Sequence, residues 1–339
     1  MLRLTIREII SRIEKEENFS CIAQDGSFTL IIEDYVPYIC TAIHNGGNLR
    51  AGLREKISLN KAERWYEEDI LTGTFISSLP IRIVANDSRY EYDLNRSLKE
   101  AIYEKAWGKK VWNKKLTLAE KELSYKKHKA FYKVVDKLLE KVISKFKACI
   151  VYDIHSFNYK RMEMPDVPLF NIGTVNVNKK FRPFIDDWKK RLKKIKSDYI
   201  EARVEENLVF QGKGNFLKHI SKKHKDALVL ATEVKKSYCD EESGDIFPEV
   251  IADLKNGLKK AIIENAKFFT NEKANISVTK MHSLLSSGID PIVRDIDENL
   301  YSLLKDFDVL DYVNPKNIET EKRKFFSSKY KYVPAPLAA

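Results

Sequence analysis

The sequence predicts a mixed, mostly parallel α/β sheet flanked by helices. Three short apolar runs, at residues 38–43 (YICTAI), 148–154 (ACIVYDI) and 227–232 (ALVLAT), have the length and composition of buried strands. The stretch 118–146 precedes the second run, and its apolar residues recur at three- and four-residue spacing, as on one face of a helix. Strands that read as continuous apolar runs between helices are typical of parallel sheets.

The same periodicities extend over most of the chain. We expect further strands at residues 28–32 and 81–85 and a strand starting at 173, with helices at 1–16, 59–76, about 181–205, near 217 and at 247–268. Residues 97–116 are polar and carry two tryptophans. Large irregular segments often cover functional sites, so this stretch is expected to be an insertion that faces the site.

One catalytic α/β domain is expected over residues 1–270, including the insertion at about 97–116. Residues 271–330 are helical and polar in pattern and predict a C-terminal helical extension, whereas 331–339 read as a disordered tail. The sequence has no apolar stretch long enough to span a membrane and no signal-peptide pattern at its start. A cytoplasmic protein without a membrane partner is therefore expected.

The chain is basic, with a net charge of +11, and 32% of its residues are charged. Lysine and glutamate are mixed along helical stretches such as residues 120–127 (EKELSYKK), which favours a solvated lysine-rich surface over nucleic-acid binding. An anionic partner or substrate attracted by the positive field is the alternative. The four cysteines lack CxxC spacing, so neither a disulfide framework nor a cysteine-type zinc site is indicated.

Polar residues follow the three apolar runs at the point where each is expected to end. The first run leads to His44, the second to His155 and the third to Glu233. Ligands of open α/β sheets bind at the carboxyl ends of the strands. Two imidazoles and a carboxylate at one sheet edge favour a divalent metal ion, with zinc first, and a general base beside it.

A third ligand is expected from the acidic cluster that follows His44 on the predicted helix. We favour Asp69, with Glu68 as the alternative. Further along, Asn95-Arg96 forms a candidate clamp for a substrate carboxylate, because arginine offers a bidentate fork and asparagine an amide donor. Arg89 lies in the same irregular segment and would support it.

Glu233 is the candidate general base, since a carboxylate beside a metal can accept a proton from water. The alternative for Glu233 is a surface ion pair with Lys235 or Lys236. Ser156 directly follows His155 and is expected to hydrogen-bond within the site rather than to act as a nucleophile. HExxH, P-loop and GxSxG motifs are absent from the sequence, which leaves a zincin-type protease, a P-loop enzyme and an α/β-hydrolase unsupported.

Taken in order, these motifs resemble the N-formylglutamate amidohydrolase family, which is related to the zinc carboxypeptidases and aspartoacylases. The resemblance spans about residues 36–255 and is carried by His44-Asn45-Gly46, Glu68-Asp69, residues 89–96 (RYEYDLNR), Asp153-Ile154-His155-Ser156, Gly173-Thr174 and Thr232-Glu233-Val234. The chain departs from the family at Asn45, where serine is common, and at Ile154, where cysteine is usual. The loop at 207–214 also lacks the family's proline and tyrosine.

The resemblance implies a zinc exopeptidase-like fold that hydrolyses an amide. Zinc would lie on His44, His155 and either Asp69 or Glu68. The roles implied for the remaining residues are catalysis for Glu233 and Arg96, substrate binding for Arg89, Asn95, Arg96, Gly173 and Thr174, and support of the metal ligands for Asp153 and Ser156.

The first candidate substrate by this resemblance is N-formyl-L-glutamate. A carboxypeptidase-like activity on a short peptide or protein tail is the alternative, because the insertion fits a larger substrate at least as well. The alternative of another class is a non-catalytic basic binding protein that retains the fold.

Overall fold

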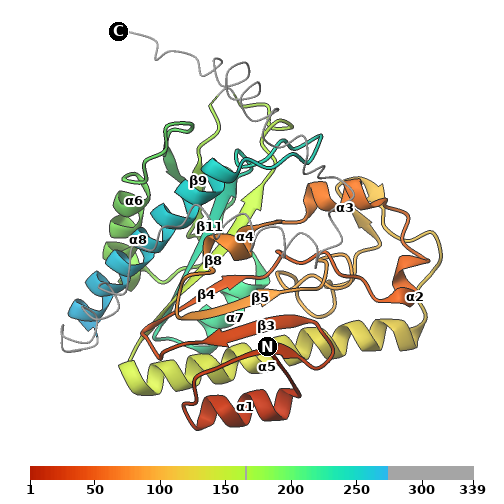
Figure 1. The fold of residues 1–339 in the computed structure, drawn as a ribbon, viewed down its shortest axis with the longest axis horizontal. Coiled ribbons are helices and arrows are strands. Elements are labelled where there is room, and N and C mark those ends of the chain that lie inside the picture. The colour runs from red at the N-terminus through yellow and green to blue at the C-terminus, as the bar shows by residue number, and fades with distance from the viewer. Residues whose placement is uncertain (165, 274–339) are drawn as a thin grey trace.

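The structure is a computed structural model that describes residues 1–164 and 166–273. Its main feature is a nine-stranded sheet in the order β1-β2-β3-β5-β4-β8-β11-β9-β10 (Figure 1). The strands are β1 (Leu2–Leu4), β2 (Phe19–Ala23), β3 (Phe28–Ile32), β4 (Tyr38–Ala42), β5 (Ile81–Ala85), β8 (Cys149–Phe157), β9 (Phe170–Gly173), β10 (Val204–Glu206) and β11 (Ala227–Lys235). Within the described residues, five of the eight neighbouring pairs are parallel. The mixed, mostly parallel sheet is therefore confirmed.

Helices cover both faces of the sheet (Figure 1). One layer contains α1 (Ile6–Glu14), α5 (Leu118–Phe146) and α7 (Asn215–Lys223), and the other contains α4 (Thr72–Phe75), α6 (Arg182–Leu192, after the 3-10 turn Lys179–Phe181) and α8 (Pro248–Lys273). The short helices α2 (Ala51–Arg54) and α3 (Lys61–Glu67) lie at one end of the sheet with the hairpin β6 (Lys105–Ala106) and β7 (Lys109–Lys110). The central strands are thus buried on both faces, as the apolar runs predicted.

Helix α5 shows why the sequence pattern was informative. It begins after Thr117, which forms a capping box with Glu120, and ends at Lys147 in the left-handed region with φ of 67°. Its apolar face packs on the sheet, where the rings of Phe131 and Phe28 meet edge to face at 5.5 Å. The helix expected at 118–146 has these bounds in the structure.

The helix expected at 59–76 is wrong, because the chain breaks between α3 and α4. Glu68 is extended with ψ of 145°, and Leu71 is left-handed with φ of 64°. The buried ammonium of Lys236 donates hydrogen bonds to the carbonyls of Tyr66, at 2.6 Å, and Glu68, at 2.8 Å. These tertiary contacts outweigh local helix propensity. The break brings the backbone N–H of Asp69 to the carbonyl of His44, at 3.1 Å.

Two predicted strand ends are also wrong, because β8 and β11 continue past residues 154 and 232. These two strands pair in parallel over all nine of their residues. Each strand satisfies the other's backbone groups, so neither stops where its apolar run stops. His155 and Glu233 consequently lie within strands, as register partners of each other.

Three further boundaries differ from expectation. The helix predicted at 1–16 starts later, at Ile6, because residues 2–4 form strand β1, which pairs with β2. The predicted helix at about 181–205 ends at Leu192, and its last residues enter β10, which pairs with β9. Gly173 ends a strand instead of starting one. In each case a neighbouring strand offers backbone partners that the local sequence does not reveal.

The predicted helical extension at 271–330 lies outside the described residues beyond the end of α8, and so does the predicted tail at 331–339. In the part of the chain that the structure describes, every helix is too short or too polar to cross a membrane. The cytoplasmic location stays a prediction.

Candidate active site

His44, Asp69 and His155 converge at the carboxyl end of the central strands. His44 follows β4, Asp69 occupies the break between α3 and α4, and His155 lies near the end of β8. All three are buried, and one ligand atom from each lies within 4.8 Å of the others. The two imidazole rings are 5.0 Å apart between centroids. This arrangement could hold a metal ion.

A second carboxylate supports each imidazole. His44 Nε2 lies 2.8 Å from Asp93 Oδ1, and His155 Nε2 lies 2.8 Å from Asp153 Oδ2. Asp153 in turn accepts a hydrogen bond from the hydroxyl of Thr41, at 2.6 Å. A carboxylate on the far nitrogen of a metal-binding histidine fixes the tautomer and the ring orientation.

The other nitrogen of each ring faces Asp69. His155 Nδ1 lies 3.0 Å from Asp69 Oδ2, and His44 Nδ1 lies 3.4 Å from the same oxygen. His44 Nδ1 is buried without a hydrogen-bond partner. An orphaned buried imidazole nitrogen beside a carboxylate fits a ligand set of two histidines and one acid, which suits zinc.

The buried charges of the site stabilise one another. Burial raises the pKa of Asp69, but His155, His44 and Arg89 outweigh this effect and hold the pKa below its usual range. Burial also raises the pKa of Asp93, and here His44 and Arg89 again reverse the direction. For His155, burial lowers the pKa, yet Asp153 and Asp69 raise it well above the ordinary value. The carboxylates of Asp69 and Asp93 are therefore ionised at neutral pH.

Glu68, the alternative ligand, lies outside this cluster. Its Oε1 accepts a hydrogen bond from the hydroxyl of Ser88 and lies 3.8 Å from Arg64 Nη1. Its Oε2 packs against Gly47, and a Cβ on residue 47 would lie 3.1 Å from that oxygen. Burial raises the pKa of Glu68. The geometry thus favours Asp69 over Glu68 as the third ligand.

Glu233 stands beside the cluster on β11, directly across from His155 in the strand register. It is half-buried and lines the same cleft as the two histidines. Burial raises the pKa of Glu233 to about 7, although His155 and His44 oppose the shift. A carboxyl group with a pKa near neutrality can both accept and release a proton there.

The cleft has a volume of about 280 Å³ and is lined by most of the residues that the sequence singled out, namely His44, Asp69, Arg89, Asn95, Arg96, Asp153, His155, Ser156, Gly173 and Glu233. Asn95 also lines the cleft, and its amide oxygen accepts a hydrogen bond from the N–H of Phe216, at 3.2 Å. Thr174 does not line this cleft, and its hydroxyl donates to Glu206 Oε1 at 2.6 Å.

The N-formylglutamate amidohydrolase family model matches residues 36–238, more than half of the chain. The chain belongs to this family. His44, Asp69 and His155, their supporting carboxylates and Glu233 all lie within the matched range. Membership of the N-formylglutamate amidohydrolase family makes the chain an amidohydrolase, which confirms the family predicted from its motifs.

Solved structures agree with the family assignment at the level of the fold. N-formylglutamate amidohydrolase from Ralstonia eutropha JMP134 is 17% identical with a TM-score of 0.63, covering 73% of this chain and 99% of that chain. A gene product from Agrobacterium tumefaciens is 14% identical with a TM-score of 0.51, covering 70% of this chain and 95% of that chain. Among curated proteins, none matches this chain significantly.

Arg89 lines the cleft of this amidohydrolase and contacts two of its carboxylates. Its Nη2 lies 3.1 Å from Asp93 Oδ2 and its Nη1 lies 3.5 Å from Asp69 Oδ1. Its guanidinium also stacks 4.9 Å from the ring of Trp107. Both charged contacts hold site carboxylates, so Arg96 is the better placed of the two arginines to meet a substrate anion.

Sequence reasoning gave no role at the site to Asp93 or Arg161, and it named Lys236 only as a possible ion-pair partner of Glu233. Asp93 lies inside the DLNR motif, so the motif itself was a signal for it. Trp107 lies in the hairpin turn with Gly108, and the two residues have φ of 48° and 77°. Trp107 belongs to the stretch 97–116 that was expected to face the site, whereas no pattern in the sequence pointed to Arg161.

Proposed function

We propose that this amidohydrolase is a zinc-dependent enzyme that cleaves a carboxylate-bearing N-acyl amino acid, with N-formyl-L-glutamate as the first candidate. The observation that supports zinc is the convergence of His44, Asp69 and His155, with Asp93 and Asp153 behind the two imidazoles. Two histidines and one acid leave an open position in the four-coordinate geometry of catalytic zinc.

His44, His155 and Asp69 would hold the ion, and bound Zn²⁺ would supply Lewis-acid polarisation of the amide carbonyl and a more acidic water. The protein's own contribution starts with orientation. Asp93 and Asp153 fix the two rings so that a nitrogen of each faces Asp69. Their charges also favour binding of a cation in this buried place.

Glu233 acts as the proton carrier. It takes a proton from the water that attacks the carbonyl carbon and delivers that proton to the departing amine as the C–N bond breaks. Its position across from His155 and its pKa of about 7 support this role. A base that is too acidic would not accept the proton, and one that is too basic would not release it.

Arg96 binds the substrate carboxylate, with the Asn95 amide nitrogen beside it. The Arg96 side chain is exposed, and although partial desolvation lowers its pKa, the hydroxyl of Tyr103 and the nearby Asp93 raise it, so the guanidinium stays charged. A charge-assisted pair of this kind positions the amide and gives specificity for acidic substrates. Gly173 lines the cleft with its backbone alone. A Cβ on residue 173 would lie 2.3 Å from the backbone N of Gly212, so no side chain fits there.

The test combines metal analysis with a substrate screen. We expect one zinc per chain and hydrolysis of N-formyl-L-glutamate or another N-acyl amino acid by the zinc-loaded protein. A Glu233→Gln variant, which keeps the shape of the side chain, should retain zinc and lose turnover. A folded protein that binds no divalent metal would instead support the non-catalytic binding protein.

A further inference from the structure

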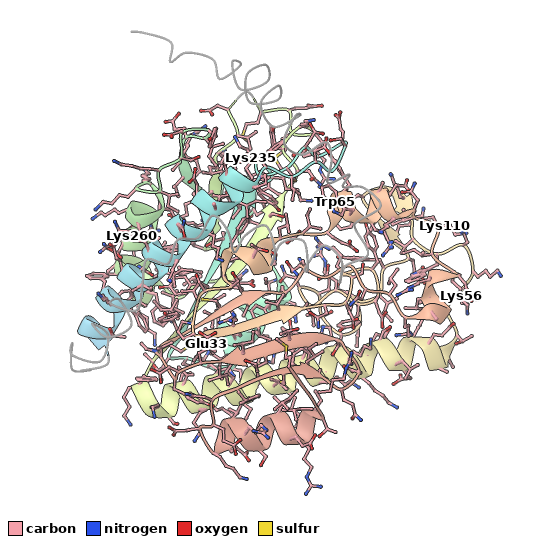
Figure 2. The ribbon with its side chains drawn as sticks, in the orientation of Figure 1. Glu33, Lys56, Trp65, Lys110, Lys235 and Lys260 are labelled. Carbon is pink, nitrogen blue, oxygen red and sulfur yellow. The ribbon has the colours of Figure 1, made fainter. Side chains whose placement is uncertain are left out.

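A second cavity adjoins the catalytic cleft. Its volume is about 530 Å³, and it shares Glu67, Trp107 and Arg161 with the cleft. Its other walls come from α3, from the hairpin and from residues 241–244. Figure 2 shows Trp65 of α3 and Lys110 of the hairpin on the same side of the molecule. Trp65 and the neighbouring hairpin residue Lys109 line the cavity. Three shared wall residues make the two spaces neighbours.

Four aromatic side chains line this cavity beside its charged residues: Trp65, Tyr66, Tyr90 and Trp107. The rings of Tyr90 and Trp107 meet edge to face with centroids 6.0 Å apart. An aromatic guest gains from such surroundings, because edge-to-face and offset-stacked pairs add to the burial of ring surface. The cavity therefore suits a planar apolar group more than a small polar one.

The charged groups of the cavity are largely paired with one another. Lys109 Nζ lies 2.8 Å from Glu63 Oε1, and Arg161 forms an ion pair with Glu67. Carboxylates still outnumber cations there, because Glu241 and Glu242 also line the walls. Lys160, outside the lining, lies 3.6 Å from Glu242 Oε1 and offsets part of this charge. The lining carboxylates that remain disfavour an anionic guest and suit a protonated amine.

Trp107 connects the two spaces. It stacks on Arg89 at the catalytic cleft and is also a wall of the second cavity. Its left-handed backbone and that of Gly108 form the tight turn between β6 and β7, which presents the ring at the junction. The Trp107 side chain is 41% exposed, so its ring has free surface for a ligand.

The proposed substrate pose directs the acyl group to the second cavity. Arg96 lines the catalytic cleft but not the second cavity. With the carboxylate of the departing amino acid on Arg96, the acyl group is the end of the substrate that can reach the residues shared by the two spaces. A formyl group has a single carbon and would leave the second cavity empty.

We propose that the second cavity is a subsite for an aromatic aminoacyl group, so that the enzyme cleaves dipeptides in which an aromatic residue precedes a carboxylate-bearing one. This inference rests on the proposed amide hydrolysis. Water adds to the peptide carbonyl, the C–N bond breaks, and Glu233 passes the proton to the amine. The products are a free aromatic amino acid and a free acidic amino acid.

The test compares substrates that differ only on the acyl side. Zinc-loaded protein is assayed with N-formyl-L-glutamate, L-alanyl-L-glutamate and L-phenylalanyl-L-glutamate. We expect kcat/KM for the phenylalanyl dipeptide to exceed that for the alanyl dipeptide by about tenfold or more. Tyr66→Ala and Trp107→Ala should each reduce this ratio toward one. Tyr125→Ala, on α5 and outside both cavities, should keep it.

Binding separates failure of the subsite from failure of the hydrolase. Glu233→Gln protein is titrated with both dipeptides by calorimetry, which needs no turnover. If no substrate is cleaved but the phenylalanyl dipeptide still binds about tenfold more tightly, the proposed hydrolysis fails and the subsite stands. Equal affinities, or a cleavage ratio near one in the wild type, overturn the subsite. Trp107→Ala carries the test if Tyr66→Ala does not fold, because Trp107 lies on an exposed turn.

Discussion

Asp93 Oδ1 lies 2.8 Å from His44 Nε2, although 49 residues separate the two in sequence. The same carboxylate binds Arg89 and accepts a hydrogen bond from the hydroxyl of Tyr103. Asp93 thus connects one imidazole of the proposed zinc site to the segment that also carries Arg96. A carboxylate in this position controls the ring orientation and the electron density of a metal-binding histidine.

Asp93→Asn is expected to weaken zinc binding by roughly 10- to 100-fold, because the amide removes the charge that supports His44. The affinity is measured by competition with a chromogenic chelator. Asp153→Asn should act in the same direction through His155, and Asp226→Asn, on the surface, should leave the affinity unchanged. If Asp93→Asn and Asp153→Asn both fold and bind zinc as the wild type does, the supporting role of these carboxylates is wrong.

Glu233→Gln is expected to lower kcat by roughly 10²- to 10⁴-fold, the usual contribution of a positioned general base. The side chain keeps its size but loses the ability to take a proton. Zinc content and the unfolding midpoint serve as controls and should stay near wild-type values. Turnover equal to that of the wild type would show that another group carries the proton.

Arg96→Ala should lower kcat/KM for acidic N-acyl amino acids by roughly 10- to 100-fold, as expected for the loss of a charge-assisted hydrogen bond. The matched control is the same substrate with its carboxylate converted to a carboxamide, on which the wild type and the variant should act alike. An equal loss on both substrates would contradict a carboxylate-binding role and point to a structural one.

The Glu206–Arg182 pair predicts an acid-sensitive contribution to stability. Arg182 Nη1 lies 2.7 Å from Glu206 Oε1, and the hydrogen bonds from Arg182, Thr174 and Lys189 together lower the pKa of Glu206 from 4.5 to about 2, with Arg182 the largest cause. Because the folded-state pKa is depressed, ionised Glu206 stabilises the fold above about pH 4.5, and this contribution is lost as the pH falls toward about 2.

The variant Glu206→Gln isolates that contribution, since its side chain does not titrate. We expect the wild type to be the more stable protein at about pH 7, with the difference in unfolding free energy shrinking steadily below about pH 4.5. Urea denaturation at several pH values measures it. A difference that is constant down to about pH 3 would contradict the assigned shift.

Hydrophobic periodicity alone predicted the helices and strands that bury one or both of their faces. The helix at 118–146 and the strands at 28–32 and 81–85 have the bounds that their periodicity predicts. The same reading found His44 and His155, because apolar runs that deliver histidines to one sheet edge are visible in the sequence. It also favoured Asp69 among the acids of the cluster that follows His44, with Glu68 as the alternative.

The parts that escaped prediction depend on contacts between distant residues. Lys236 donates hydrogen bonds to the carbonyls of Tyr66 and Glu68, about 170 positions earlier, where the helix predicted at 59–76 breaks. The local sequence around 59–76 does not predict these contacts. Asp69 reaches the site only through that break. Trp107 and Arg161 meet at the second cavity from separate loops. Periodicity reports which face of an element is buried, but it does not report which loops meet.

Zinc stoichiometry in the wild type and in a His44→Ala, His155→Ala double variant tests the central claim most directly. After dialysis against trace zinc, mass spectrometry of the metal should give one ion per wild-type chain and almost none in the double variant, with His219→Ala as a histidine control that keeps its ion. Circular dichroism checks that the double variant is folded. If the folded double variant binds as much zinc as the wild type, or if the wild type binds none, the two imidazoles do not form the metal site on which the proposed hydrolysis depends.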